Sequence, residues 1–221
     1  EMGVIFVPVI GAVCVAFLVK TFAPEAKGHG VPEVMDAIYY TRGTIRPVVA
    51  VVKSIASAIS IGTGGSVGRE GPIVQIGAAF ASTVGQLIRM PTYQRVWLIA
   101  AGAGGGIAAT FNTPIGGMLF ATELMLPSIK ARSMLIVVLG SATATYSGRA
   151  VLGVDPAFNI PEITHPSHQL MGSLALPVLA LAGIIFWLIA AIFIKSIYWF
   201  EDLFDFISCF YYTRHCLGMF I

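Results

Sequence analysis

Seven apolar stretches alternate with short polar segments along the chain. They lie at about residues 4–19, 48–62, 73–88, 96–110, 114–126, 133–152 and 174–200. Several are shorter than the roughly 20 residues that a straight helix needs to cross a bilayer. Glycine and proline interrupt them, and non-helical backbone at membrane depth is tolerated only where it lines a cavity or is buried in protein. The pattern predicts an all-α, polytopic membrane protein with broken and re-entrant helices, and it favours a transporter or channel over a simple anchor.

The composition supports a membrane protein and argues against a soluble domain. Apolar residues make up 57% of the 221 residues and charged residues only 11%, against roughly 25% in an average globular chain. A formal net charge of +2 identifies no partner, and no nucleic acid partner is expected. The chain begins at Glu1 and stops at Ile221 within an apolar stretch, so we expect it to be an excerpt of a longer protein.

Basic residues indicate which polar segments face the cytoplasm. One group surrounds the first long polar segment and another a later one, so both segments are expected on the cytoplasmic side. The groups are Lys20, Lys27, Arg42, Arg46 and Lys53, and then Lys130 with Arg132. The segment 153–172 is expected on the opposite side of the membrane.

Cysteine and histidine residues show no spacing typical of metal ligands. Apart from His29, discussed below, they are Cys14, Cys209, Cys216, His165, His168 and His215. Cys14 falls within an apolar stretch, where a thiol behaves as a small hydrophobic group. We therefore expect neither a metal nor a cofactor.

Three glycine-rich motifs precede predicted helix starts. They are Gly28-His29-Gly30-Val31-Pro32-Glu33, the run from Gly62 to Pro72, and Gly102-Ala103-Gly104-Gly105-Gly106 followed by Asn112-Thr113-Pro114. Proline suits the first turn of a helix, and Asn or Thr before it can cap the first N–H groups. Helix N-termini carry free N–H groups and a positive dipole end, so the motifs predict ends that attract an anion. The alternative is that the glycines only let helices pack closely, which we favour for the third motif.

Glu70 is an ionisable residue between apolar segments, at the start of a predicted membrane helix. Such residues are functional candidates, although a first-turn acid can also simply complement the helix dipole or pair with Arg69. A carboxylate at an anion-attracting helix end can take the anion's place when ionised and vacate it when protonated. We interpret Glu70 as the gate of an anion pathway that responds to pH.

At these residues the sequence resembles the CLC family of voltage-gated chloride channels and chloride/proton antiporters. The run Gly68-Arg69-Glu70-Gly71-Pro72 is similar to the family's gating-glutamate motif, and Gly28-His29-Gly30-Val31-Pro32 to its Gly-Ser-Gly-Ile-Pro anion motif. The stretch from Ala101 to Glu123 also resembles the family. The resemblance implies that both runs bind the anion, that Glu70 is the gate, and that Glu70 and Glu123 are candidates for a proton pathway.

The resemblance also implies an architecture of two inverted repeats in each subunit of a homodimer. Residues 1–221 would form part of a CLC-type transmembrane domain, with the first repeat at about 1–152 and the start of the second at about 170–221. The helices from Ile115 to Leu152 would lie at the dimer interface. The implied partners are chloride or a similar anion, protons in the case of an exchanger, and the lipid bilayer, with the cell membrane as the location.

Two positions depart from the family pattern. His29 stands where the family commonly has Ser, so an imidazole replaces a hydroxyl donor at the anion site. Leu124 follows Glu123 where antiporters often have a second acid as inner proton acceptor, and an apolar side chain cannot hold a proton. We therefore favour passive, channel-like anion conduction, with chloride/proton antiport as the alternative.

Two other classes of function fit less well. Gly64-Gly65-Ser66-Val67-Gly68 matches the G-x-S-x-G pattern of serine hydrolases, but no strand is predicted before it and no complete triad is evident. An intramembrane hydrolase is therefore not favoured, and no catalytic residue is assigned. A cation transporter would use helix C-terminal carbonyls and paired acids, whereas Glu70 and Glu123 accompany helix N-termini.

Overall fold

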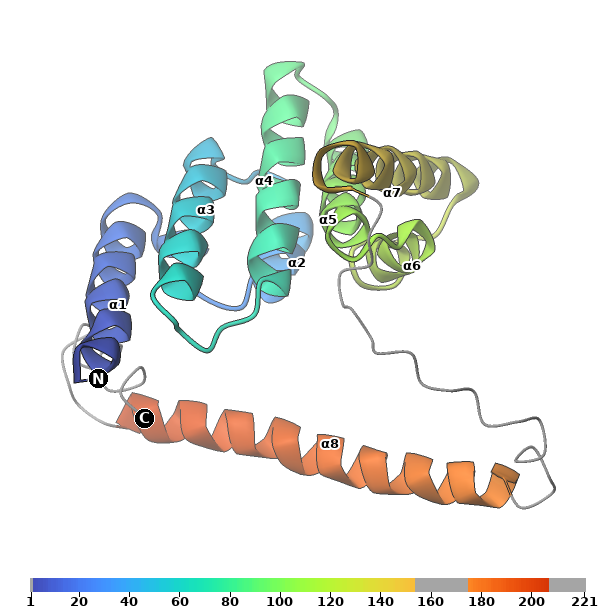
Figure 1. Ribbon diagram of the computed structural model, residues 1–221. Coiled ribbons are helices and arrows are strands. Elements are labelled where there is room, and N and C mark those ends of the chain that lie inside the picture. Colours follow the sequence, from blue (N-terminus) through green and yellow to red (C-terminus); the bar gives the residue numbers. More distant parts are fainter. Residues whose placement is uncertain (1, 154–174, 207–221) are drawn as a thin grey trace. The chain divides into compact units, whose positions relative to one another are not determined.

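The computed structural model describes residues 2–153 and 175–206, and every regular element in these two ranges is a helix (Figure 1). The described residues fall into two compact units, with α1 to α7 in one and α8 in the other. The elements are α1 Met2–Phe22, the short 3-10 helix η1 Pro24–Ala26, α2 Val31–Tyr39, α3 Pro47–Gly62, α4 Glu70–Leu87, α5 Thr92–Phe111, α6 Pro114–Leu124, α7 Ala131–Leu152 and α8 Ala175–Phe206. The all-α prediction is confirmed.

Each predicted apolar stretch becomes one helix, and α2 is added between the first two of them. Helix α2 has nine residues and α6 has eleven. At about 1.5 Å of rise per residue, neither can cross a hydrocarbon core of about 30 Å. The short, interrupted helices expected from the sequence are therefore present.

Helix α5 is the centre of the first unit, because it contacts α4, α6 and α7. Glycines make these contacts close: the backbone of Gly102 meets that of Gly77 on α4, and a Cβ at Gly104 would lie 2.6 Å from the carbonyl oxygen of Gly117 on α6. The run from Gly102 to Gly106 thus lies inside α5 and serves helix packing. The packing interpretation favoured for this motif is confirmed, and the run does not form a helix N-terminus.

The helix start of the third motif lies further along, at Pro114. Thr113 is the N-cap of α6, and its hydroxyl oxygen accepts the backbone N–H of Gly116 at 3.2 Å. The cap predicted at this point is therefore confirmed.

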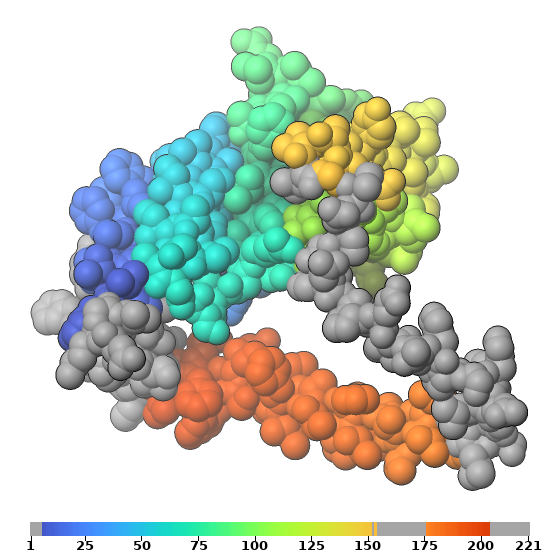
Figure 2. Space-filling view, viewed as in Figure 1, coloured from blue at the N-terminus to red at the C-terminus, as the bar shows by residue number. Residues whose placement is uncertain are grey.

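Helix α4 also holds the connection between α2 and α3. The Ser82 hydroxyl donates to the carbonyl of Gly43 at 2.8 Å and accepts the N–H of Ile45 at 2.9 Å. The Gln86 amide donates to the carbonyl of Ile45 at 2.8 Å. Together with the packing of α3 against α4, visible as adjoining surfaces in Figure 2, these bonds fix α2 and α3 relative to α4.

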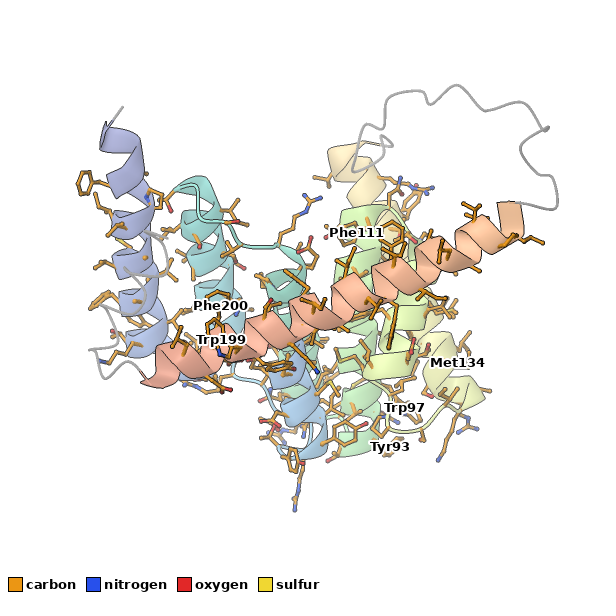
Figure 3. All side chains as sticks on the ribbon, turned by 90° about the horizontal axis from the view of Figure 1, so that it is seen from below. Tyr93, Trp97, Phe111, Met134, Trp199 and Phe200 are labelled. Atoms are coloured by element: carbon orange, nitrogen blue, oxygen red, sulfur yellow. The ribbon has the colours of Figure 1, made fainter. Side chains whose placement is uncertain are left out.

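Two helical segments in the described ranges are long and apolar enough to cross a membrane. They are Ala131–Val151, with a mean hydropathy of 1.2, and Leu176–Leu203, with 2.7, while Phe6–Phe22 and Pro47–Gly62 are shorter apolar segments. Aromatic rings lie near the ends of two helices: Tyr93 and Trp97 meet edge to face in the first turns of α5, and Trp199 and Phe200 do so on α8 (Figure 3). Tyrosine and tryptophan favour membrane interfaces.

Several predictions concern residues beyond the described ranges. These are the segment 153–172 apart from Gly153, and His165, His168, Cys209, His215 and Cys216. Cys14 lies on α1 as a free thiol and is exposed. Within residues 2–153 and 175–206, no group of three or more His, Cys, Asp or Glu side chains could hold a metal ion.

Candidate functional site

The first glycine motif forms the turn that begins α2. Gly28 and Gly30 have φ angles of +111° and +98°, values that residues with a side chain rarely adopt. Gly30 is the N-cap, and α2 begins at Val31 with Pro32 at its second position. The predicted helix start is confirmed to within one residue, and His29 is exposed between the two glycines.

Glu33 closes this turn from inside the first turn of α2. Its Oε2 accepts the backbone N–H of Gly30 at 2.6 Å, which is one half of a capping box. The Gly30 N–H is therefore bonded within the protein. In this structure Gly30 shapes the loop, and its amide is not presented to a ligand.

The second motif connects α3 to α4. Helix α4 begins at Glu70, so Gly71 and Pro72 lie in its first turn, while Gly68 and Arg69 precede it and are exposed. Glu70 is also exposed, and its carboxylate folds back over Gly68, where a Cβ would overlap Oε2. A helix, not a strand, precedes the Ser66 segment, so the structure lacks the strand-to-helix turn of a hydrolase nucleophile.

The two motifs meet at their backbones. A Cβ on Gly71 would collide with the carbonyl oxygen of His29, and a Cβ on Gly30 would collide with the carbonyl oxygen of Gly71. Only residues without side chains allow this approach. The structure thus brings the N-termini of α2 and α4 together, with Glu70 adjacent to the contact.

Lys53 is buried at this junction. Its charge grouped it with the basic residues that surround the first long polar segment. It lies inside α3 with 8% of its surface exposed. Its ammonium group donates to the carbonyls of Ala26 at 2.7 Å and Gly28 at 2.9 Å. Its position within the apolar stretch 48–62 was the signal for this role, because a charge inside a membrane helix needs a specific partner.

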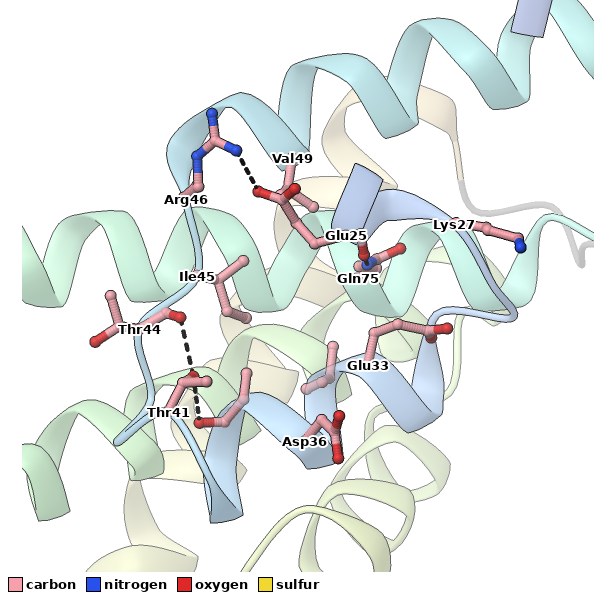
Figure 4. A pocket seen from close by; sticks show the side chains of 12 residues that line it. Glu25, Lys27, Glu33, Asp36, Thr41, Thr44, Ile45, Arg46, Val49 and Gln75 are labelled. Atoms are coloured by element: carbon pink, nitrogen blue, oxygen red, sulfur yellow. Dashed lines mark hydrogen bonds and ion pairs between the residues drawn. The ribbon is translucent and has the colours of Figure 1, made fainter. Parts of the chain in front are cut away.

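A cavity of about 390 Å³ lies beside the same turn (Figure 4). Glu33 lines it, together with residues of η1, α2, α3, α4 and the α2–α3 connection. Arg46 and Glu25 form an ion pair of 2.8 Å at its edge. Gln75 is 2% exposed, and its amide donates to the carbonyl of Glu25 at 3.3 Å, while its Oε1 has no partner among the described residues.

The structure does not bring Glu123 to this junction. Glu123 and Leu124 are the last two residues of α6, and both are exposed. The expectation that Glu123 accompanies a helix N-terminus is therefore wrong, whereas Glu70 does begin α4. Helix α6 packs mainly against α5 and α7, whereas α2 packs against α4. The two carboxylates proposed for a proton pathway therefore lie on different parts of the fold.

Comparison with known proteins decides the family. Residues 11–221 match the family model of the voltage-gated chloride channel. The chain belongs to the CLC family. It is 36% identical over 188 residues to the H⁺/Cl⁻ exchange transporter ClcA of Vibrio parahaemolyticus, and 30% identical over 217 residues to the chloride channel protein CLC-f of Arabidopsis thaliana.

The fold agrees with that of a solved CLC protein. A slow cyanobacterial Cl⁻/H⁺ antiporter matches 99% of this chain with a TM-score of 0.84 and 22% sequence identity. The match to ClcA covers 82% of this chain but only 38% of ClcA, and the match to CLC-f covers 93% of this chain but 26% of CLC-f. The antiporter match covers 51% of the antiporter chain. The chain thus spans about a quarter to a half of these relatives, and as a CLC member it is an integral membrane protein.

Proposed function

We propose that the protein containing this chain exchanges chloride, or a similar small anion, for protons across a membrane, and that this chain supplies one side of the anion site. The observation that carries the proposal is the backbone contact between Gly30 and Gly71. It places the N-termini of α2 and α4 together beside Glu70. Two positive helix ends attract an anion without the deep trap that a full positive charge would create.

Glu70 is the gate in this proposal. Its ionised carboxylate competes with the anion for the helix ends, and its protonated form leaves them free. We assign the conformer folded over Gly68 to the blocked state. The residues proposed to surround the anion are Gly28, His29, Gly30, Val31, Pro32, Gly68, Arg69, Gly71 and Pro72.

Exchange is better supported than the passive conduction favoured from the sequence. ClcA is named an exchange transporter and the solved structure an antiporter, although CLC-f is named a channel. Because Leu124 cannot hold a proton, exchange needs another inner acceptor, and Glu123 is our candidate. Passive anion conduction is the alternative function.

The architecture proposed from the resemblance is a homodimer in the cell membrane. Residues 1–152 would form the first repeat and residues from about 170 to 221 the start of the second. Apolar side chains remain exposed on α6 and α7 of the first unit, among them Ile115, Leu119, Leu135 and Leu139. Lipid or a second subunit would cover them.

The reversal potential of the full-length protein in a lipid bilayer tests this function. With a chloride gradient and equal pH on both sides, an exchanger and a channel both respond to chloride, and a pH gradient added afterwards shifts the potential only for the exchanger. A potential that ignores the pH gradient would favour the passive alternative. A potential that follows the cation gradient would contradict anion transport altogether.

A further inference from the structure

Lys53 is a buried cation to which the transport scheme above gives no role. A lysine is rarely buried unless its charge is compensated, because removing an ammonium from water is costly. Here the backbone carbonyls of Ala26 and Gly28 accept its N–H groups. Both of these partners belong to the segment that leads into α2.

The bond to Gly28 fixes the orientation of one peptide group. Every peptide bond in the described residues is trans, so the carbonyl of Gly28 and the N–H of His29 point in opposite directions within one plane. The carbonyl points at Lys53, and the N–H therefore points away from α3. No backbone acceptor takes this N–H within the described residues.

The opposite orientation would be harmful to an anion site. If the Gly28 peptide were reversed, its carbonyl oxygen would face away from α3 and present negative partial charge where the N–H now lies. Glycine permits such reversals easily, because it adopts positive and negative φ with similar ease. The neighbouring Gly30 N–H is already held by Glu33, so Lys53 and Glu33 fix the turn from two sides.

We propose that Lys53 is a positioning residue that turns the Gly28–His29 peptide so that its N–H faces the anion at the start of α2. This inference rests on the proposed function, because it requires an anion at this helix end. It differs from a role of the charge alone, in which Lys53 would attract the anion at a distance and any cation would serve. It also differs from a purely structural role, which would change stability but not anion affinity.

Chloride titration of the full-length protein by calorimetry, with Lys53→Met, Lys53→Gln and Lys53→Arg, separates these roles. The methionine side chain has a similar length but no hydrogen-bond donor. We therefore expect Lys53→Met to raise the chloride Kd by about tenfold, the effect of losing one well-placed hydrogen bond. Gln donates without a charge and Arg donates with one, so both should keep the Kd near the wild-type value. Lys130→Met, at an exposed lysine before α7, is the matched control and should bind chloride like the wild type.

Each outcome decides the inference. If Lys53→Gln loses chloride affinity as Lys53→Met does, while Lys53→Arg keeps it, the charge of Lys53 alone is responsible and positioning is refuted. If all three variants keep the wild-type Kd and only the thermal stability falls, Lys53 is merely structural. If Lys53→Met does not fold, Lys53→Gln still tests the inference against a role of charge alone: a chloride Kd weaker than that of the wild type overturns positioning. A wild-type protein that binds no chloride would refute the proposed function itself.

Discussion

Replacing Gly68 by alanine should remove the place that the Glu70 carboxylate occupies. A Cβ at Gly68 would overlap Oε2 of Glu70 and lie 3.6 Å from its Cδ. Among the residues that the structure describes, no other atom outside its chain neighbours lies within 4 Å of that Cβ, and the φ angle of Gly68 is not positive. Alanine therefore fits the backbone, and the flexible end of Glu70 must move by about 1 Å or more to regain an ordinary contact distance.

The size of the effect follows from the cost of this overlap. Gly68 and Glu70 are both exposed, so the cost is that of forcing the Glu70 side chain off its rotamer, about 0.5–1.5 kcal/mol. At about 1 kcal/mol, the population of the folded-back conformer falls roughly fivefold. Since we assign this conformer to the blocked state, Gly68→Ala should raise chloride flux at neutral pH towards its value at acid pH and flatten the pH dependence.

Chloride efflux from liposomes at neutral and acid pH measures this effect. Gly62→Ala is the control, because a Cβ there meets nothing within 4 Å. The double variant Gly68→Ala/Glu70→Gln should behave like Glu70→Gln alone, because both changes act on the same group. A Gly68→Ala protein that folds and keeps the wild-type pH profile would refute the assignment of this conformer to the blocked state.

Three further changes test other parts of the account. Gly102→Ala should lower thermal stability by about 1–3 kcal/mol relative to Gly62→Ala, because its Cβ would overlap Gly77 of α4; equal melting temperatures would contradict the close packing. Glu33→Ala should weaken chloride binding more than Glu33→Gln, since Gln still accepts the Gly30 N–H, and equal losses by calorimetry would argue against this cap. Glu123→Gln should reduce proton movement per chloride while chloride flux persists, and an unchanged ratio would place the inner acceptor elsewhere.

The positions of the helices can be predicted from the sequence, because each membrane helix is marked by its own apolar run and by the residues at its start. Apolar runs and Gly-Pro starts predict α1 and α3 to α8, and the first motif predicts the start of α2, although only nine residues follow it. The same signals cannot separate a glycine at a helix end from one inside a helix. For this reason the run in α5 was grouped with the other two motifs, although packing was favoured for it, and its contacts with Gly77 and Gly117 confirm that it serves packing.

The site was predicted less completely because its central contacts are distant in sequence. Gly30 and Gly71 meet across forty residues, and no local pattern reveals that their backbones touch. Lys53 bonds to carbonyls 25 and 27 residues away. Counting charges grouped it with Arg42 and Arg46 around the first long polar segment, whereas its actual partners are backbone groups that the sequence does not distinguish from any others.

Proton uptake driven by chloride tests the central claim most directly. Liposomes containing the full-length protein, or its Glu70→Gln variant, are given a chloride gradient, and both proton and chloride movements are recorded. The account predicts that the wild type moves protons against their gradient, and that Glu70→Gln moves chloride without protons. Wild-type chloride flux without any proton movement, or proton uptake that survives in Glu70→Gln, would contradict it.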